Sequence, residues 1–155
     1  MKSEKQIIFR IGADEYGLSV MDVRAIENNV NINVVPNGPA YLKGIIQMRG
    51  DVIPVYSLRK KFGLADKEPD DNTKLIITTS NDILMAYEVD MVQEIIEIDE
   101  NQIIETPGIV KCEDTKYIRN VANINGRLII LLDYNGILDV KEQEHTKVLL
   151  EELAK

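Results

Sequence analysis

The sequence predicts a mainly β fold, either a barrel or a sandwich, from three observations. Short runs rich in β-branched residues recur along the 155 residues and are bounded by Gly, Pro, Asn and Asp. Hydrophobic residues make up 45% of the chain, and a domain of this length buries about 70% of its unfolded surface. Two stretches of the chain also repeat one pattern at a fixed offset. Together these features predict one domain built from two related halves.

The local patterns assign each element in chain order. Strands are expected at residues 6–11, 15–20, 30–35, 45–48, 51–56, 74–79, 84–89, 92–98, 117–124 and 127–132. Short helical turns are expected at residues 21–26, 57–62 and 134–138. Residues 65–73 have no apolar periodicity and residues 105–116 form a second long connector, so both are expected to be loops. His145, Leu149 and Leu153 recur at every fourth position, which predicts an amphipathic helix in the tail.

The repeated pattern indicates an internal duplication. Residues 47–62 align without gaps with residues 123–138, at an offset that places Gly50 on Gly126. A looser match, which needs a small gap, joins residues 15–27 to residues 86–97. Any two amphipathic hairpins resemble one another to some degree. Two matches in the same order nevertheless favour two copies of one β unit.

The tripeptide Arg49-Gly50-Asp51 spells a cell-adhesion motif, but the duplication gives it another meaning. Its counterpart Asn125-Gly126 lies between two apolar runs and is a strong signal for a hairpin turn. Arg49 and Gly50 therefore occupy a turn, and Pro54 marks an edge or a bulge in the next strand. Arg is disfavoured where φ is positive, so turn chemistry favours a different turn type with a solvated Arg49. The alternative is a guanidinium held for a carboxylate of a partner or a neighbour.

Charge argues against several classes of partner. The chain has 18 Lys and Arg against 26 Asp and Glu, for a net charge of −8. Because phosphate contacts need clustered cations, neither nucleic acid nor an acidic membrane surface is an expected partner. Cys112 is the only cysteine, which rules out an intramolecular disulfide. The N-terminus has no signal-peptide pattern and the longest aliphatic run, residues 128–132, is too short for a bilayer, so we expect a cytoplasmic protein without membrane insertion.

Signals for catalysis are sparse, and we expect neither an enzyme nor a cofactor or metal site. His145 lies in the polar tail without a recognisable nucleophile, and Cys112 has no local His partner. No Cys/His metal spacing or phosphate-binding glycine loop is present. Two other readings stay open, a small-ligand or catalytic β-barrel and an oligonucleotide-binding barrel. The first requires a polar internal cavity and the second requires aromatic platforms on a basic face.

Four segments in order resemble the CheW family of bacterial chemotaxis adaptors. They are residues 15–26, 41–63, 86–95 and 124–138, and the resemblance covers roughly residues 5–138. The central GIIQMRGDVIPVYSLRKKFG is similar to the family signature of Asn-Leu-Arg-Gly, an aliphatic–Pro strand and Asp-Leu-Arg. The resemblance implies two five-stranded β-barrel subdomains, of the SH3 or OB type, with short helices and a C-terminal helix.

Within a single CheW-like domain of residues 1–155, the expected subdomain boundaries follow from the resemblance and the duplication. Residues 15–72 form the first barrel and residues 73–138 the second, with exchange of the N-terminal strand left open. Residues 139–155 form the C-terminal helix.

The resemblance also implies partners and a binding site. The expected partners are the cytoplasmic tip of a chemoreceptor and the regulatory domain of the histidine kinase CheA, which place the protein beside membrane receptor arrays. Val23, Gly44 and Arg49 match receptor-contact positions, with Val20 as an apolar neighbour, and Glu27 or Asp51 is expected to support Arg49. The chain departs from the family pattern where other members carry Glu, Asn, Leu and Asp, namely at Ala25, Gln47, Met48 and Ser57. A divergent paralogue serving another receptor–kinase cluster is the alternative.

Overall fold

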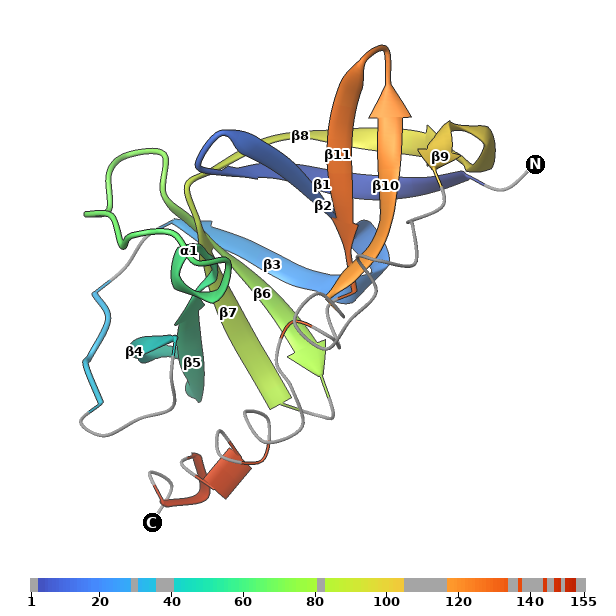
Figure 1. The fold of residues 1–155 in the computed structure, drawn as a ribbon. Coiled ribbons are helices and arrows are strands. Elements are labelled where there is room, and N and C mark those ends of the chain that lie inside the picture. The colour runs from blue at the N-terminus through green and yellow to red at the C-terminus, as the bar shows by residue number, and fades with distance from the viewer. Residues whose placement is uncertain are drawn as a thin grey trace.

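The strands form two sheets that lie against each other, and the mainly β prediction is confirmed (Figure 1). The computed structural model describes residues 3–28, 31–35, 41–80, 83–104, 117–133, 137, 144, 147–148 and 150–152. Cys112 and His145 lie outside these residues, as does most of the predicted turn at 134–138. The described residues of the tail from 144 onward are helical, as predicted. No helix in the described part of the chain is long and apolar enough to cross a membrane.

The six-stranded sheet has the order β8-β1-β2-β11-β10-β9. Its strands are β1 (Ser3–Ile11), β2 (Asp14–Ser19), β8 (Met91–Asp99), β9 (Ile103–Ile104), β10 (Ile118–Ile124) and β11 (Arg127–Leu132). The five-stranded sheet has the order β3-β6-β7-β5-β4. Its strands are β3 (Val23–Asn28), β4 (Leu42–Met48), β5 (Asp51–Ser57), β6 (Lys74–Ser80) and β7 (Ile83–Val89). The short helices are η1 (Val20–Asp22), α1 (Leu58–Lys61) and η2 (Glu100–Gln102).

Two details of the architecture differ from the expectation. The sheets hold six and five strands, where two five-stranded β-barrels were expected. The expected boundary between residues 72 and 73 also does not coincide with the division of the strands. β6 and β7 join the first-half strands β3 to β5, because β7 pairs in parallel with β5. β1 and β2 instead join β8 to β11, through the parallel pairing of β2 with β11.

Most expected elements are confirmed, but the segment after β2 is not. A helical turn was expected at residues 21–26, whereas η1 ends at Asp22 and β3 begins at Val23. β3 alternates half-buried and exposed side chains, the two-residue period of a strand. The strand expected at residues 30–35 is reduced to an isolated bridge between Asn33 and Ile45. The helical turn expected at residues 57–62 is present as α1.

Both sheets repeat one strand order, in agreement with the internal repeat in the sequence. The order β3-β6-β7-β5-β4 corresponds to β8-β1-β2-β11-β10. The hairpin turns are also the same, because φ is 52° at Arg49 and 86° at Gly50, against 53° at Asn125 and 90° at Gly126. The different turn type favoured for Arg49 is therefore wrong. Two positive φ angles in a two-residue loop define the turn that matches the twist of paired strands.

A shared apolar core joins the sheets. It takes Phe9, Tyr16 and Leu18 from one sheet and Tyr56 and Tyr87 from the other, all of them buried. A second cluster fills the curled six-stranded sheet and a third fills the five-stranded sheet, each with aliphatic side chains. The described interior is thus packed with apolar side chains, which does not favour a ligand-binding barrel.

Aromatic rings extend the shared core toward α1. Tyr16 stacks on Phe9 at 5.9 Å and on Phe62 at 5.0 Å between ring centroids, and Phe62 stacks on Tyr117 at 4.9 Å. Burial raises the pKa of Tyr16 to about 12, so its ring stays neutral in this apolar setting. The stack fixes the end of α1 against the six-stranded sheet.

Candidate functional site

The five-stranded sheet curls until its two edges meet beside Arg49. β3 and β4 are the outermost strands of that sheet, yet Glu27 of β3 lies 3.7 Å from the Arg49 guanidinium. The curl is also closed by Asn33, which exchanges two backbone hydrogen bonds of 2.9 Å with Ile45 of β4. The hairpin turn is thereby brought onto a strand that is distant in the sheet order.

Glu27 is the predicted support that contacts Arg49. The alternation of β3 places Glu27 on the same half-buried face as Val23 and Ala25, toward the inside of the curl. Asp51, the other predicted support, lines the same hollow as Arg49. The Arg49 side chain remains 81% exposed, so a single ion pair holds a largely solvated guanidinium.

A small hollow opens at this end of the five-stranded sheet, and we name it the Arg49 cup. Its volume is about 170 Å³. It is lined by Arg24, Ala25, Met48, Arg49, Asp51, Ile53, Ile77 and Leu84. The apolar members belong to the cluster that fills the sheet, and the charged members surround the opening. An apolar floor with a charged rim suits a protein side chain that carries a polar neighbour.

Val20 and Val23 lie where the chain crosses from the six-stranded to the five-stranded sheet. Val20 begins η1 and Val23 packs against the shared core, and neither lines the Arg49 cup. Between them, the Met21 side chain is 88% exposed, and its backbone N–H donates to Ser19 Oγ at 3.3 Å. Burial raises the pKa of Asp22 in the same turn. This crossing therefore presents an unusually exposed apolar side chain beside two predicted contact residues.

Gly44 was expected to be a receptor-contact position, but another segment of its own chain lies against it. A Cβ at this position would lie 2.2 Å from the carbonyl oxygen of Asn33 and 2.7 Å from Ile32 Cγ2. The residue is buried in β4 and paired beside the Asn33–Ile45 bridge. The closure of the curl accounts for this glycine without any partner.

Arg59, which belongs to helix α1, links several segments of the fold. It donates to Asp90 at 2.5 Å and to the carbonyl oxygen of Ala65 at 2.8 Å. The same Asp90 oxygen accepts the backbone N–H of Gly12 at 2.8 Å. Asp90 lies between β7 and β8, so these bonds tie the second crossing between the sheets to α1 and to the β1–β2 turn.

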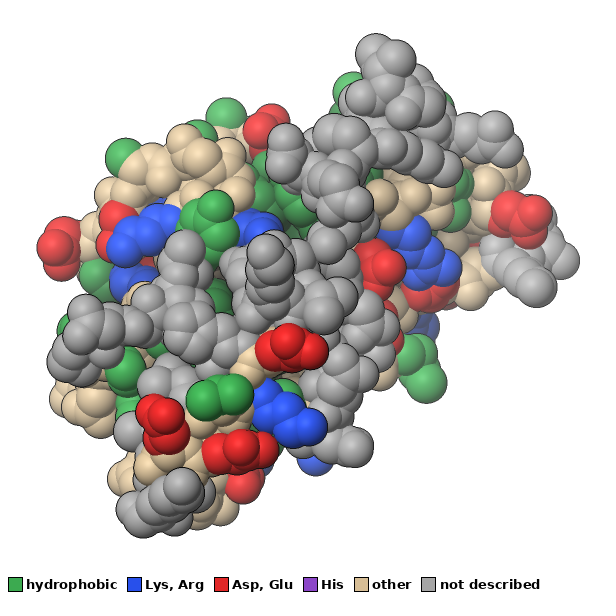
Figure 2. Space-filling model, turned by 60° about the horizontal axis from the view of Figure 1, so that its bottom comes forward, with side chains coloured by type: hydrophobic (Ala, Val, Ile, Leu, Met, Phe, Trp, Pro, Cys, Tyr) green, Lys and Arg blue, Asp and Glu red, His purple; other side chains and the backbone are tan. Residues whose placement is uncertain are grey.

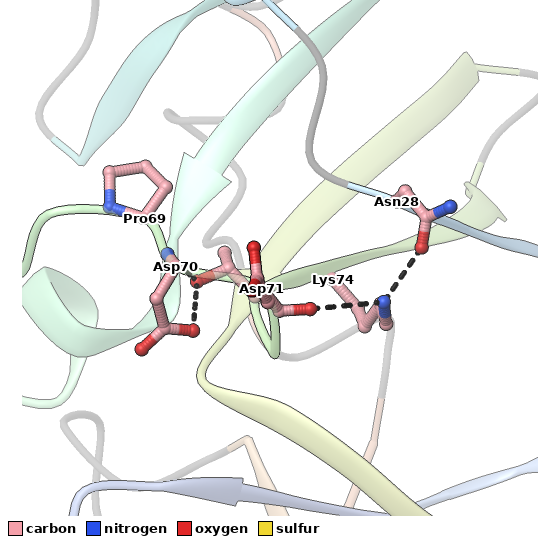
Figure 3. A pocket seen from close by; sticks show the side chains of 6 residues that line it. Asn28, Pro69, Asp70, Asp71 and Lys74 are labelled. Atoms are coloured by element: carbon pink, nitrogen blue, oxygen red, sulfur yellow. Dashed lines mark hydrogen bonds between the residues drawn. The ribbon is translucent and has the colours of Figure 1, made fainter.

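A second hollow, of about 450 Å³, lies beside the acidic connector (Figure 3). Asn28, Pro69, Asp70, Asp71, Thr73 and Lys74 line it. Its polar groups bond to one another: Lys74 Nζ donates to Asn28 at 2.7 Å, and Asp70 accepts from the backbone of Asn72 at 2.8 Å. The hydrogen bond from Lys67 lowers the pKa of Asp70. These bonds close a loop, in agreement with the solvated connector that the sequence predicts.

The six-stranded sheet has its own arginine at the equivalent turn. Arg127, next to Gly126, donates two hydrogen bonds to Glu15, at 2.5 and 3.3 Å, and lies 3.7 Å from Glu94 of β8. The hydrogen bond from Arg127 lowers the pKa of Glu15 below its ordinary value of 4.5, against the opposing effect of burial. Each sheet thus has an arginine near this turn, at positions that are not equivalent in the repeat: Arg49 lies against Glu27 of β3, and Arg127 pairs with Glu15 of β2 and lies near Glu94 of β8.

Replacing Arg127 with Gln is expected to destabilise the protein at neutral pH and progressively less below pH 4.5. A carboxylate whose pKa is lowered by folding adds stability above its unfolded pKa and loses it as the pH falls through the folded value. Urea unfolding of both proteins across the acid range measures the difference. Carboxyl NMR should show the Glu15 midpoint rising in Arg127→Gln, and an unchanged midpoint would contradict the assignment.

Several residues of the Arg49 cup were not predicted from the sequence. Arg24, Ile77 and Leu84 come from three strands, β3, β6 and β7, of which the sequence predicts only β6 and β7. Only the curl of the sheet brings them to the β4–β5 turn. The charge of Arg24 within the alternating strand β3 was a signal in the sequence, but it does not reveal which residues lie across the opening.

The surface mixes charges of both signs. Figure 2 shows Lys and Arg side chains interleaved with Asp and Glu on the face in view, without a broad basic area among the coloured atoms. Among the described residues, no group of three or more His, Cys, Asp and Glu side chains could hold a metal ion. Nucleic-acid binding therefore finds no support on this face.

Comparisons with known proteins point to one family. The profile of the CheW-like domain matches residues 5–142. The chain is 34% identical to the chemotaxis protein CheW of Bacillus subtilis over 145 residues, which cover 94% of this chain and 92% of that protein. It is 27% identical to the chemotaxis protein CheW of Thermotoga maritima over 139 residues, or 90% of each chain. The crystal structure of the scaffolding protein TtCheW from Thermoanaerobacter tengcongensis superposes with a TM-score of 0.81 at 30% identity, and covers 92% of each chain.

Proposed function

Because this chain belongs to the CheW-like domain family, we propose that it is a non-enzymatic adaptor that holds a chemoreceptor tip and the histidine kinase CheA together. The observation that carries the proposal is the structural similarity to a scaffolding protein, with a TM-score of 0.81 over 92% of each chain. The adaptor would act at the cytoplasmic side of a receptor array without entering the membrane. Its partners would be the helical tip of the receptor and the regulatory domain of the kinase.

The physical basis of such an adaptor is the fixed relation between its two sheets. A shared aromatic core joins them, so surfaces on the two sheets keep a constant geometry. Two partners bound to one rigid body reach a high effective concentration for each other. A conformational bias in one partner then reaches the other through a common frame.

Receptor contact is proposed for the region around Arg49, with Val20 and Val23 at the crossing as apolar contacts. Glu27 would position the Arg49 guanidinium while leaving donors free for a carboxylate of the receptor. Gly44 would act indirectly, through the closure of the curl by Asn33. An apolar surface with an arginine at its edge suits one face of an amphipathic helix.

Two departures from the family pattern favour a specialised paralogue, serving another receptor–kinase cluster, as the second candidate. Ala25 and Met48 both line the Arg49 cup and so alter its shape. The change to Ser57 preserves the helix cap, because its Oγ caps α1 by accepting the backbone N–H of Lys60 at 3.2 Å. Ser and Asp serve equally at this position of a helix. The differences therefore concentrate where receptor contact is proposed.

Calorimetric titration with the CheA regulatory domain and a receptor-tip fragment from the same cell tests the proposal. Wild-type protein is expected to bind both. Arg49→Ala is expected to weaken binding of the receptor-tip fragment by roughly tenfold, the loss typical of an arginine hot spot, and to leave the affinity for the kinase domain unchanged. Lys67→Ala is the matched control, because Lys67 is also an exposed cation with one acidic partner.

The outcomes separate the two candidates. Binding to neither fragment would overturn the adaptor function for this receptor–kinase pair and favour the paralogue. Binding to both, with equal tip affinity for wild type and Arg49→Ala, would retain the adaptor and remove Arg49 from the contact.

A further inference from the structure

The Arg49 cup has the composition of an anchor site for a partner. Ile53 and Ile77 on its floor are only 2% and 3% exposed and belong to the core of the five-stranded sheet. Met48 and Leu84 are partly buried and pack against the same cluster. An apolar group that entered the cup would therefore continue an existing core, which is the setting in which burial stabilises most.

The size of the cup selects the kind of occupant. Its volume of about 170 Å³ is close to the roughly 150 Å³ of a cavity that holds one benzene molecule. Small-molecule and cofactor sites begin at about 300 Å³. The cup therefore has room for one side chain of a protein partner and not for a cofactor.

The hydrogen-bond donors of the rim select what accompanies that side chain. Arg24 and Arg49 lie on the rim with Asp51, and Glu27 lies beside Arg49, so the acidic and basic groups balance in number and the guanidinium donors decide the fit. Each guanidinium has five donors, and the partners observed here leave several unused: Arg24 donates to Thr79 at 3.3 Å and Arg49 lies 3.7 Å from Glu27. A carboxylate is the group that an arginine pair of this kind binds best.

We propose that the Arg49 cup binds one aliphatic side chain of a partner protein, while a neighbouring carboxylate of that partner pairs with Arg49 and Arg24. The proposal deepens the adaptor function and rests on it for the identity of the partner. Ala25 determines the specificity, because it has the smallest side chain on the lining and keeps the cup open. A larger residue here would fill the space that the partner's side chain needs.

A small mimic tests the chemistry of the cup in the protein alone. The probe is 4-methylpentanoate, which joins a branched aliphatic end to a carboxylate, and NMR shifts of Ala25, Met48 and Leu84 are the readout. We expect saturable shifts at roughly millimolar concentration, as for other ligands of this size. 4-Methylpentanol and acetate each lack one of the two groups and are expected to bind more weakly.

Ala25→Leu is expected to abolish the shifts caused by 4-methylpentanoate. The matched control is Ala13→Leu, the same change at an exposed turn of the other sheet. If Ala25→Leu lowers the melting temperature, Ala25→Val serves instead. Shifts that lie elsewhere, or that persist in a folded Ala25 variant, would overturn the proposal.

Titration of the receptor-tip fragment connects the cup to the adaptor function. Ala25→Leu is expected to weaken binding of the tip fragment by at least roughly tenfold, as the loss of an anchor does. Ala13→Leu is expected to bind the fragment with wild-type affinity. Should the wild type bind the mimic but not the tip, the adaptor function would fail for that receptor and the cup would stand. Equal tip affinity for both Ala25 forms would overturn the cup as the receptor anchor.

Discussion

Gly44→Ala is expected to reduce the free energy of unfolding by about 2–4 kcal/mol, through loss of two hydrogen bonds and a backbone conformation that L residues rarely adopt. The new Cβ would lie 2.2 Å from the Asn33 carbonyl oxygen, and φ at this position is 156°. Because that contact is with backbone, no side-chain rotation relieves it. The segment carrying Asn33 must move away and release Ile45.

Urea unfolding measures the change, and hydrogen exchange at the Ile45 amide shows whether the bridge is lost. Gly50→Ala is the matched control, because Gly50 also has a positive φ but its Cβ would meet nothing within 4 Å. The control is expected to lose only the backbone preference, about 1–2 kcal/mol. Equal losses in both variants would contradict the steric role of Asn33. If the larger loss is found for Gly44→Ala, any weaker binding of a partner by this variant would come from the displaced segment and not from a lost contact with Gly44.

Phe9→Ala is expected to reduce the free energy of unfolding by about 3–5 kcal/mol, the usual loss for a fully buried phenylalanine. Phe9 is 0% exposed and stacks on Tyr16 in the core that the two sheets share. The total free energy of unfolding of a domain of this kind is about 5–15 kcal/mol. Both sheets are therefore expected to unfold together at a lower urea concentration.

Amide NMR signals from each sheet, followed through the urea titration, check this prediction. Leu128→Ala is the control, since that side chain is 58% exposed and surface changes usually stay within about 0.5 kcal/mol. A transition that shifts for the six-stranded sheet alone would show that the cores are independent.

Local features of the fold could be predicted from the sequence because each depends on neighbouring residues. Asn125-Gly126 marks its turn through its own backbone preferences, and Ser57 with the following residues marks α1. The aligned repeat carried the first of these turns to Arg49 and Gly50. It also predicted the equivalence that the two strand orders display.

Features that depend on distant residues could not be predicted. Val23 and Ile26 are spaced as on a helix face, and only pairing with β6 selects the strand. The subdomain boundary failed because nothing local in β7 specifies β5 as its parallel neighbour. The candidate site was predicted only in part. Glu27 was expected to support Arg49 and does lie beside it. Arg24 and Leu84 were not predicted, because they reach the Arg49 cup only through the curl of the sheet.

The crossings at η1 and Asp90 have a consequence for how the chain can be divided. β3 follows the hairpin of one sheet and pairs in the other, and β8 does the reverse. Each half of the chain, β1 to β5 or β6 to β11, therefore supplies strands to both sheets and completes neither. The fold has the connectivity of a swapped dimer whose two subunits are fused through the segment after α1. Each half alone would expose unpaired strand edges, so the repeat unit of the sequence is not a folding unit.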